Sequence, residues 1–292
     1  MNPVVRFASL PHGIRLPYVE QGDPRGTPVV FLHGVTDSWR SFEPVLPELP
    51  DGIRAFALTQ RGHGDADRPE TGYRPQDFAA DVDAFMEALQ LGPAVVVGHS
   101  MGGSVAQRLA LDHPERLLGL VLAGARVAWH DQPDVAELVR YVDSELRDPV
   151  DPGFVAGFQQ STLAQPVPPA FFDTAVRESL KLPARVWRRV FLEGVAGADH
   201  TGLLAGIRAP TLLLCGEFDT IARSGQEALA EAIPGSRLVT YSHAGHALHW
   251  EEPARFAADV SAFVHSVTGA STGCLRGPGH ETDRQRRLAP NA

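Results

Sequence analysis

The chain has 292 residues, of which 43% are hydrophobic and 21% are charged, as in folded globular proteins and unlike disordered ones. Its formal net charge is −9, which argues against a nucleic-acid partner because binding phosphates requires a basic face that displaces counterions. The length fits one α/β unit that carries an insertion.

The pattern of apolar runs predicts a sheet. Two extended runs in the first twenty residues flank Pro11-His12-Gly13, which is typical of an antiparallel hairpin. Short β-branched runs that are apolar on both faces then recur along the chain, as expected for buried parallel strands. They lie at 28–32, 53–58, 94–98, 117–123, 210–215 and 237–241. We therefore expect a mostly parallel sheet that begins with an antiparallel hairpin.

Helical patterns separate these runs. In the segment 75–89, the apolar residues Phe78, Val82, Phe85 and Leu89 recur at helical spacing. Similar patterns cover 104–111, 225–232 and 253–267. Parallel strands that are joined by helices imply right-handed crossovers, with helices on both faces of the sheet. The predicted fold class is α/β.

A long insertion interrupts the alternation. From 126 to 209 the strand signal disappears, and helical patterns rich in Phe and Trp cover 135–146, 154–163, 171–182 and 185–195. An insertion of this length is too long for a plain loop. We therefore predict a helical cap at 126–207 on a core formed by 1–125 and 208–268. The segment 269–292 has no periodic apolar positions and is predicted to be disordered.

The sequence also gives expectations about location. The longest apolar stretches, 94–98 and 117–125, are far shorter than the roughly 20 residues needed to cross a bilayer. The first ten residues lack the apolar segment of a signal peptide. Cys215 lies in an apolar run and Cys274 in the polar tail, which does not favour a disulfide. We expect a cytoplasmic protein with no membrane partner, present as a monomer or a homodimer.

One motif predicts a nucleophile. Gly98-His99-Ser100-Met101-Gly102 matches G-x-S-x-G and stands between an apolar strand and a helical pattern. In that context a sharp strand-to-helix turn lifts the serine above the sheet, and small residues are needed two positions on either side. A bare motif of this kind also occurs by chance in unrelated chains, where it is a structural turn. Its position here favours Ser100 as a nucleophile.

A serine hydroxyl needs a base to accept its proton, and His246 is the candidate. It follows the strand at 237–241, so it should reach the same edge of the sheet as Ser100. The small pair Ala244-Gly245 before it suits a tight loop that enters a site. His243 and His249 are the alternatives, and both are expected to be surface or loop residues.

The base in turn needs a carboxylate that fixes its tautomer. Glu217 and Asp219 both follow the strand at 210–215. Asp219 is favoured because the turn after Gly216 brings the later residue back over the sheet. The loop after 117–123 offers only Gly124-Ala125-Arg126, which contains no carboxylate.

Backbone N–H groups can stabilise the oxyanion of a tetrahedral intermediate. Met101 follows the candidate nucleophile at the start of a helix, where free N–H groups and the helix dipole favour negative charge. Val35 follows Phe31-Leu32-His33-Gly34 at the end of another strand. These two residues are the predicted oxyanion-hole donors. We interpret His33 as a structural residue that hydrogen-bonds its own loop.

Five sequence elements together resemble the α/β-hydrolase superfamily, in the chain order Ser, Asp, His that is expected of it. They are His33-Gly34, Arg61-Gly62-His63-Gly64, Gly98-His99-Ser100-Met101-Gly102-Gly103, Gly216-Glu217-Phe218-Asp219 and Gly245-His246. The resemblance implies an eight-stranded, mostly parallel sheet, a cap over the site, and no metal or organic cofactor. A serine at position 100 separates the chain from the similar haloalkane dehalogenases and epoxide hydrolases, which use an aspartate nucleophile.

The substrate is less sharply defined. Among the aromatic residues near or in the cap, Trp129, Phe154, Phe158 and Trp187 are the candidates to line an apolar pocket. The alternative is that they form the cap's own core. Arg188 and Arg189 could meet a substrate carboxylate, but a solvated helix face is the favoured interpretation.

The predicted activity is hydrolysis of an uncharged, mostly apolar ester or lactone through an acyl-enzyme. One alternative is a carbon–carbon bond hydrolase of ring-cleavage products. Another is a receptor that binds a small lactone without multiple turnover, since one fold can serve several functions.

Overall fold

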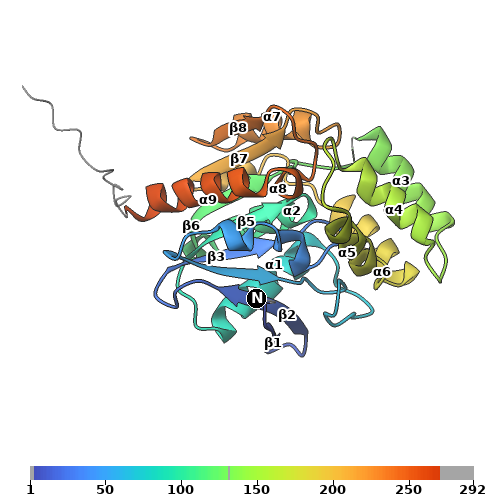
Figure 1. Cartoon of the computed structure of the whole chain (residues 1–292), viewed down its shortest axis with the longest axis horizontal. Coiled ribbons are helices and arrows are strands. Elements are labelled where there is room, and N and C mark those ends of the chain that lie inside the picture. Colours follow the sequence, from blue (N-terminus) through green and yellow to red (C-terminus); the bar gives the residue numbers. More distant parts are fainter. Residues whose placement is uncertain (1–2, 131, 270–292) are drawn as a thin grey trace, which may run out of the picture.

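The computed structural model describes residues 3–130 and 132–269, and in this part of the chain eight strands form one sheet in the order β1-β2-β4-β3-β5-β6-β7-β8 (Figure 1). The strands are β1 (Val5–Ser9), β2 (Arg15–Gln21), β3 (Thr27–Leu32), β4 (Ile53–Leu58), β5 (Ala94–His99), β6 (Leu117–Ala123), β7 (Thr211–Gly216) and β8 (Arg237–Tyr241).

The pairing confirms a mixed but largely parallel sheet. β1 and β2 form the expected antiparallel hairpin, and β2 also pairs antiparallel with β4. All the other neighbouring strands run parallel. Each predicted parallel strand lies within one residue of the observed strand. Continuous apolar runs were a reliable signal here because both faces of these strands are covered.

Helices cover both faces of the sheet. The helices of the described residues are α1 (Pro75–Ala88), α2 (Met101–Asp112), α3 (Pro133–Ser144), α4 (Pro152–Ser161), α5 (Pro169–Ser179), α6 (Ala184–Arg189), α7 (Arg223–Ala232), α8 (Leu248–Glu251) and α9 (Pro253–Thr268). Alternate side chains of one strand enter two different cores. In β5, for example, Val96 belongs to the buried cluster that includes residues of α1 and α2, whereas Val97 belongs to the cluster that includes residues of α9.

The segment predicted to be a helical cap lies between β6 and β7. Helices α3 to α6 gather at one end of the sheet (Figure 1). α6 continues into a π-helical turn, Val190–Val195. The division into a core at 1–125 and 208–268 and a cap at 126–207 stays a prediction. The predicted disordered tail at 269–292 lies, from residue 270 onward, outside the described residues.

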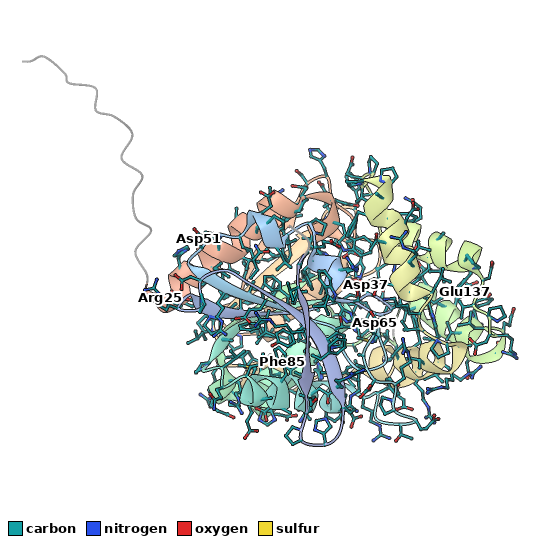
Figure 2. The ribbon with its side chains drawn as sticks, turned by 60° about the horizontal axis from the view of Figure 1, so that its bottom comes forward. Arg25, Asp37, Asp51, Asp65, Phe85 and Glu137 are labelled. Atoms are coloured by element: carbon teal, nitrogen blue, oxygen red, sulfur yellow. The ribbon has the colours of Figure 1, made fainter. Side chains whose placement is uncertain are left out.

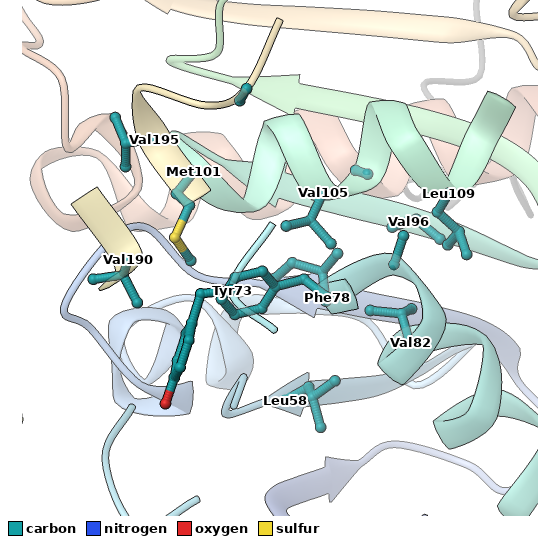
Figure 3. Packing of buried hydrophobic residues seen from close by; sticks show 14 of the residues in the cluster. Leu58, Tyr73, Phe78, Val82, Val96, Met101, Val105, Leu109, Val190 and Val195 are labelled. Carbon is teal, nitrogen blue, oxygen red and sulfur yellow. The ribbon is translucent and has the colours of Figure 1, made fainter. Parts of the chain in front are cut away.

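The cap is attached beside the start of α2. Figure 3 shows Met101 near Tyr73 and the cap residues Val190 and Val195, in one buried cluster. A Cβ atom added at Gly194 would lie 3.7 Å from the sulfur of Met101. The side chain that follows the candidate nucleophile therefore anchors the cap to the sheet.

A search of residues 3–130 and 132–269 finds no helix that is long and apolar enough to span a membrane.

Candidate active site

The candidate catalytic residues meet at one edge of the sheet. Val35 follows β3, Ser100 follows β5, Asp219 follows β7 and His246 follows β8. These strands run parallel, so their carboxyl ends lie at the same edge. Residues that are far apart in the sequence therefore converge under the cap.

Ser100 occupies a strained turn. Its φ angle is +52°, which is unusual for a residue other than glycine, and α2 begins directly after it. A Cβ atom at Gly98 would lie 2.3 Å from the carbonyl oxygen of Gly102, and one at Gly102 would lie 2.3 Å from that of Leu32. Glycine is therefore required on both sides of the turn, as the sequence motif predicts.

His246 and Asp219 form a buried pair. The Nδ1 atom of His246 donates to the Oδ2 atom of Asp219 at 3.0 Å, which leaves Nε2 as the basic nitrogen. The backbone N–H groups of Ile221 and Ala222 donate to Oδ1 of Asp219 at 2.9 and 2.8 Å. Burial acts to raise the pKa of this carboxyl group, but the nearby His246 ring and these hydrogen bonds lower it below 3.8. Asp219 is therefore held as the carboxylate.

The alternatives to this pair lie elsewhere. Glu217 and His243 are exposed. The expectation that His249 is a surface or loop residue was wrong, because the short helix α8 turns it inward. It is 0% exposed, its Nε2 lies 2.9 Å from the hydroxyl of Ser41, and its ring centroid lies 4.3 Å from that of His99. No sequence signal indicated this short helix.

The loop after β3 carries the second candidate oxyanion donor, Val35. His33 holds this loop: its Nδ1 donates to the carbonyl oxygen of Gly34 at 2.7 Å, and its Nε2 accepts from the backbone N–H of Gln60 at 3.0 Å. This is the structural role that the sequence predicted for His33. Met101 begins α2, so its N–H is one of the first four in the helix, which have no partner within it.

A cavity of about 530 Å³ opens between the sheet edge and the cap. Ser100, His246 and Val35 line it, together with the predicted cap residues Trp129, Phe154 and Phe158. Trp129 is fixed by a hydrogen bond from its Nε1 to the hydroxyl of Ser104 at 2.9 Å. The volume is within the usual range for small-molecule sites, roughly 300–1,000 Å³.

The prediction that Trp187 lines the cavity was wrong. This residue lies 0% exposed behind the cavity, with its ring centroid 5.6 Å from that of Phe154 and 5.7 Å from that of Phe158. The alternative interpretation, that it forms the cap's own core, applies to this residue. Helical spacing placed Trp187 on a buried face but could not say whether that face met the cavity or other side chains.

The charges around the cavity are acidic. Asp37, Asp134 and Glu137 line it, and among the described residues no arginine or lysine does. Arg188 instead pairs with Asp143 at 3.4 Å, and Arg189 with Glu193 at 2.5 Å. This is the solvated position that the sequence predicts for the two arginines.

Two polar residues of the cavity, Asp37 and Gln159, were missed by the sequence analysis. Asp37 lies in the loop after β3, and Gln159 lies on α4 of the cap. Gln159 Nε2 donates to Oδ1 of Asp37 at 3.0 Å, across 122 residues of sequence. Only the position of Asp37, two residues beyond Val35, could have indicated a role in the site.

Buried histidines give the fold a dependence on pH. Burial is the main cause that lowers the pKa of His33, His63, His99, His200 and His249, to about 4 for His63 and His200 and about 3 for His99. Between these values and 6.5 the unfolded chain binds protons that the folded chain does not, so stability falls as the pH falls. Burial raises the pKa of Asp37 to about 7. This single carboxyl group makes stability rise as the pH falls, and so it offsets part of the effect of the five histidines.

We therefore expect the free energy of unfolding to fall as the pH is lowered from 6.5 to 5, by at most about 1.4 kcal/mol per buried histidine per pH unit. Urea unfolding at pH 7.5, 6 and 5 measures this. His200→Gln removes one such group away from the cavity and should make the dependence less steep. Equal stability of the wild type at all three pH values would contradict the prediction.

The sheet order, the serine-bearing turn after β5 and the cap define an α/β hydrolase. A model of the alpha/beta hydrolase fold family matches residues 27–253, so the chain belongs to this family.

The chain is 31% identical to the AB hydrolase superfamily protein YisY of Bacillus subtilis (strain 168), over 82% of this chain and 92% of that protein. It is 27% identical to 2-hydroxymuconate semialdehyde hydrolase of Pseudomonas sp. (strain CF600), over 92% and 97% of the two chains. A solved structure of a thermophilic esterase from Thermogutta terrifontis superposes with a TM-score of 0.79 at 28% identity, covering 90% of this chain and 99% of that one.

Proposed function

We propose that the protein is a serine hydrolase that cleaves a carboxylic ester or lactone of a small to medium, uncharged and mostly apolar substrate. The observation that carries this proposal is the buried His246–Asp219 pair, whose histidine lines the same cavity as Ser100. Similarity to a solved esterase supports the reaction class. The aromatic lining supports a mostly apolar substrate, and the acidic residues disfavour an anionic one.

The reaction follows from these groups. The Oγ atom of Ser100 attacks the carbonyl carbon while its proton passes to Nε2 of His246. The N–H groups of Met101 and Val35 donate to the oxyanion, and Asp219 stabilises the imidazolium. His246 then protonates the leaving alcohol, which leaves an acyl group on Ser100. Water, activated by the same Nε2, attacks the acyl-enzyme and releases the acid.

The relative that hydrolyses 2-hydroxymuconate semialdehyde suggests carbon–carbon bond cleavage as the second candidate. A dienoate substrate is anionic and needs a cationic partner when it is buried. The described residues that line the cavity supply none, and Asp37, Asp134 and Glu137 would repel the anion. An ester or lactone is therefore the better supported substrate.

The test is hydrolysis of p-nitrophenyl esters of increasing acyl length, with several lactones and a ring-cleavage dienoate. We expect turnover of esters or lactones, an optimum of acyl length that fits a cavity of about 530 Å³, and little activity on the dienoate. Activity on the dienoate alone would move the assignment to carbon–carbon hydrolysis. One slow turnover with retained product would instead favour a receptor.

A further inference from the structure

A polar corner interrupts the aromatic lining of the cavity. Asp37 and Gln159 form it, and they are 5% and 1% exposed. Asp37 lies where the loop after β3 meets the cap, well inside the position of Glu137 on the cap (Figure 2). Because Asp37 is two residues beyond Val35, the corner adjoins the proposed oxyanion hole. A group bound there would lie close to the scissile carbonyl.

The corner has unused hydrogen-bonding capacity. Asp37 accepts one hydrogen bond from Gln159 at 3.0 Å and one from the hydroxyl of Ser41 at 3.2 Å. A carboxylate can accept about four. The amide nitrogen of Gln159 is engaged by Asp37 and Ser179, whereas its Oε1 receives no hydrogen bond from the described part of the chain. Both residues line the cavity, so the remaining acceptor positions of this corner can receive hydrogen bonds from a bound donor.

Surrounding contacts hold the corner in place. Thr36, just before Asp37, has a φ angle of +68° and hydrogen-bonds to Ser179 on α5 at 3.1 Å. Ser41 accepts from Nε1 of Trp250 at 2.9 Å and donates to Asp37 at 3.2 Å, and its hydroxyl also lies 2.9 Å from Nε2 of His249. A strained backbone that persists because its neighbours fix it is a common feature of functional sites.

The chemistry of the corner favours a hydroxyl group. An anion is disfavoured because the described lining has three acidic residues and no arginine or lysine. Burial raises the pKa of Asp37 to about 7, so both its protonation states are accessible near neutral pH. A hydroxyl suits both states, since it donates to a carboxylate and accepts from a carboxylic acid.

We propose that Asp37 and Gln159 form a hydroxyl-binding subsite, and that the preferred substrates are esters or lactones with a hydroxyl group close to the scissile carbonyl. This inference rests on the proposed function and adds the substrate class to it. Asp37 is a specificity residue in this account, because it contacts the substrate away from the reacting atoms.

The test uses esters that carry the hydroxyl group either on the acyl part or on the alcohol part. Ethyl 3-hydroxybutyrate is compared with ethyl 3-methoxybutyrate, and 2-hydroxyethyl butyrate with 2-methoxyethyl butyrate, with ethyl butyrate as the common reference. For at least one hydroxyl ester we expect kcat/KM to exceed that of its methyl ether and of ethyl butyrate by about 10- to 100-fold, as for one buried hydrogen bond.

Variants assign the preference to the corner. Asp37→Leu is similar in volume but cannot hydrogen-bond, so it should reduce the ratio of kcat/KM for the hydroxyl ester to kcat/KM for its methyl ether to about one. Gln159→Leu should also lower this ratio. Asp37→Asn keeps an acceptor and should retain part of it. Glu137→Gln is the matched control, because it removes a negative charge from the same cavity outside the corner and should leave the ratio at its wild-type value.

The outcomes separate the two proposals. Turnover of ethyl butyrate with hydroxyl-to-ether ratios near one in the wild type would overturn the subsite and leave the proposed function standing. A ratio that persists in folded Asp37→Leu would also overturn it. If Asp37→Leu does not fold, the wild-type ratios and Gln159→Leu decide. Wild-type protein that hydrolyses neither these esters nor the p-nitrophenyl esters and lactones of the first test would contradict the proposed function itself.

Discussion

Ser100→Ala should lower kcat for ester hydrolysis by about 10⁶-fold, the scale of the loss when a serine nucleophile is removed. The substitution deletes only the attacking hydroxyl. The backbone of residue 100 keeps its hydrogen bond from N–H to the carbonyl oxygen of Ala123 at 2.9 Å. The thermal midpoint should therefore change little. Residual activity from oxyanion stabilisation and substrate binding is expected.

Steady-state kinetics with a p-nitrophenyl ester and thermal unfolding measure these two quantities. Ser144→Ala is the control, since Ser144 is exposed on α3 and its hydroxyl bonds only to the carbonyl oxygen of Arg140 among the described residues. That variant should keep the wild-type kcat. Near-normal turnover by folded Ser100→Ala would remove Ser100 from the mechanism.

Asp219→Asn should lower kcat by about 10⁴-fold without a comparable change in KM. An asparagine can still accept the hydrogen bonds from Ile221 and Ala222, so the loop geometry is retained. Its amide group, however, would face Nδ1 of His246 with an N–H and favour the tautomer in which Nε2 carries the proton. That nitrogen could then no longer accept the proton of Ser100.

Glu217→Gln is the matched control for this prediction. Glu217 follows the same strand but is exposed, so its substitution should leave kcat within about twofold of the wild type. Comparable losses in both variants would mean that the effect comes from the charge of the loop. A large loss in Glu217→Gln alone would make Glu217 the partner of the base.

Strand placement was predictable because it rests on local sequence. Buried strands need continuous apolar runs. The residues that follow these strands lie at the edge of the sheet, and this position does not depend on how the cap packs. The choice between Asp219 and Glu217 also rested on a local turn, and Asp219 is the residue that contacts His246.

The interior of the cavity was not predictable in the same way. The contact between Asp37 and Gln159 joins the β3 loop to α4, and no local pattern links the two. For Trp187, helical spacing predicted that the side chain is buried, but it could not predict whether the side chain faces the cavity or the interior of the cap. The burial of His249 was not predicted because this residue lies on a four-residue helix, α8, whose buried residues include it. Each of these depends on how the cap packs against the sheet.

The most direct test of the central claim is labelling with a fluorophosphonate, which reacts with an activated serine, followed by mass spectrometry of the intact protein and its peptides. We expect one adduct per chain, on Ser100, with ester hydrolysis lost in proportion to labelling and no adduct in Ser100→Ala. An adduct on another residue, or full hydrolysis by protein completely labelled at Ser100, would contradict the central claim.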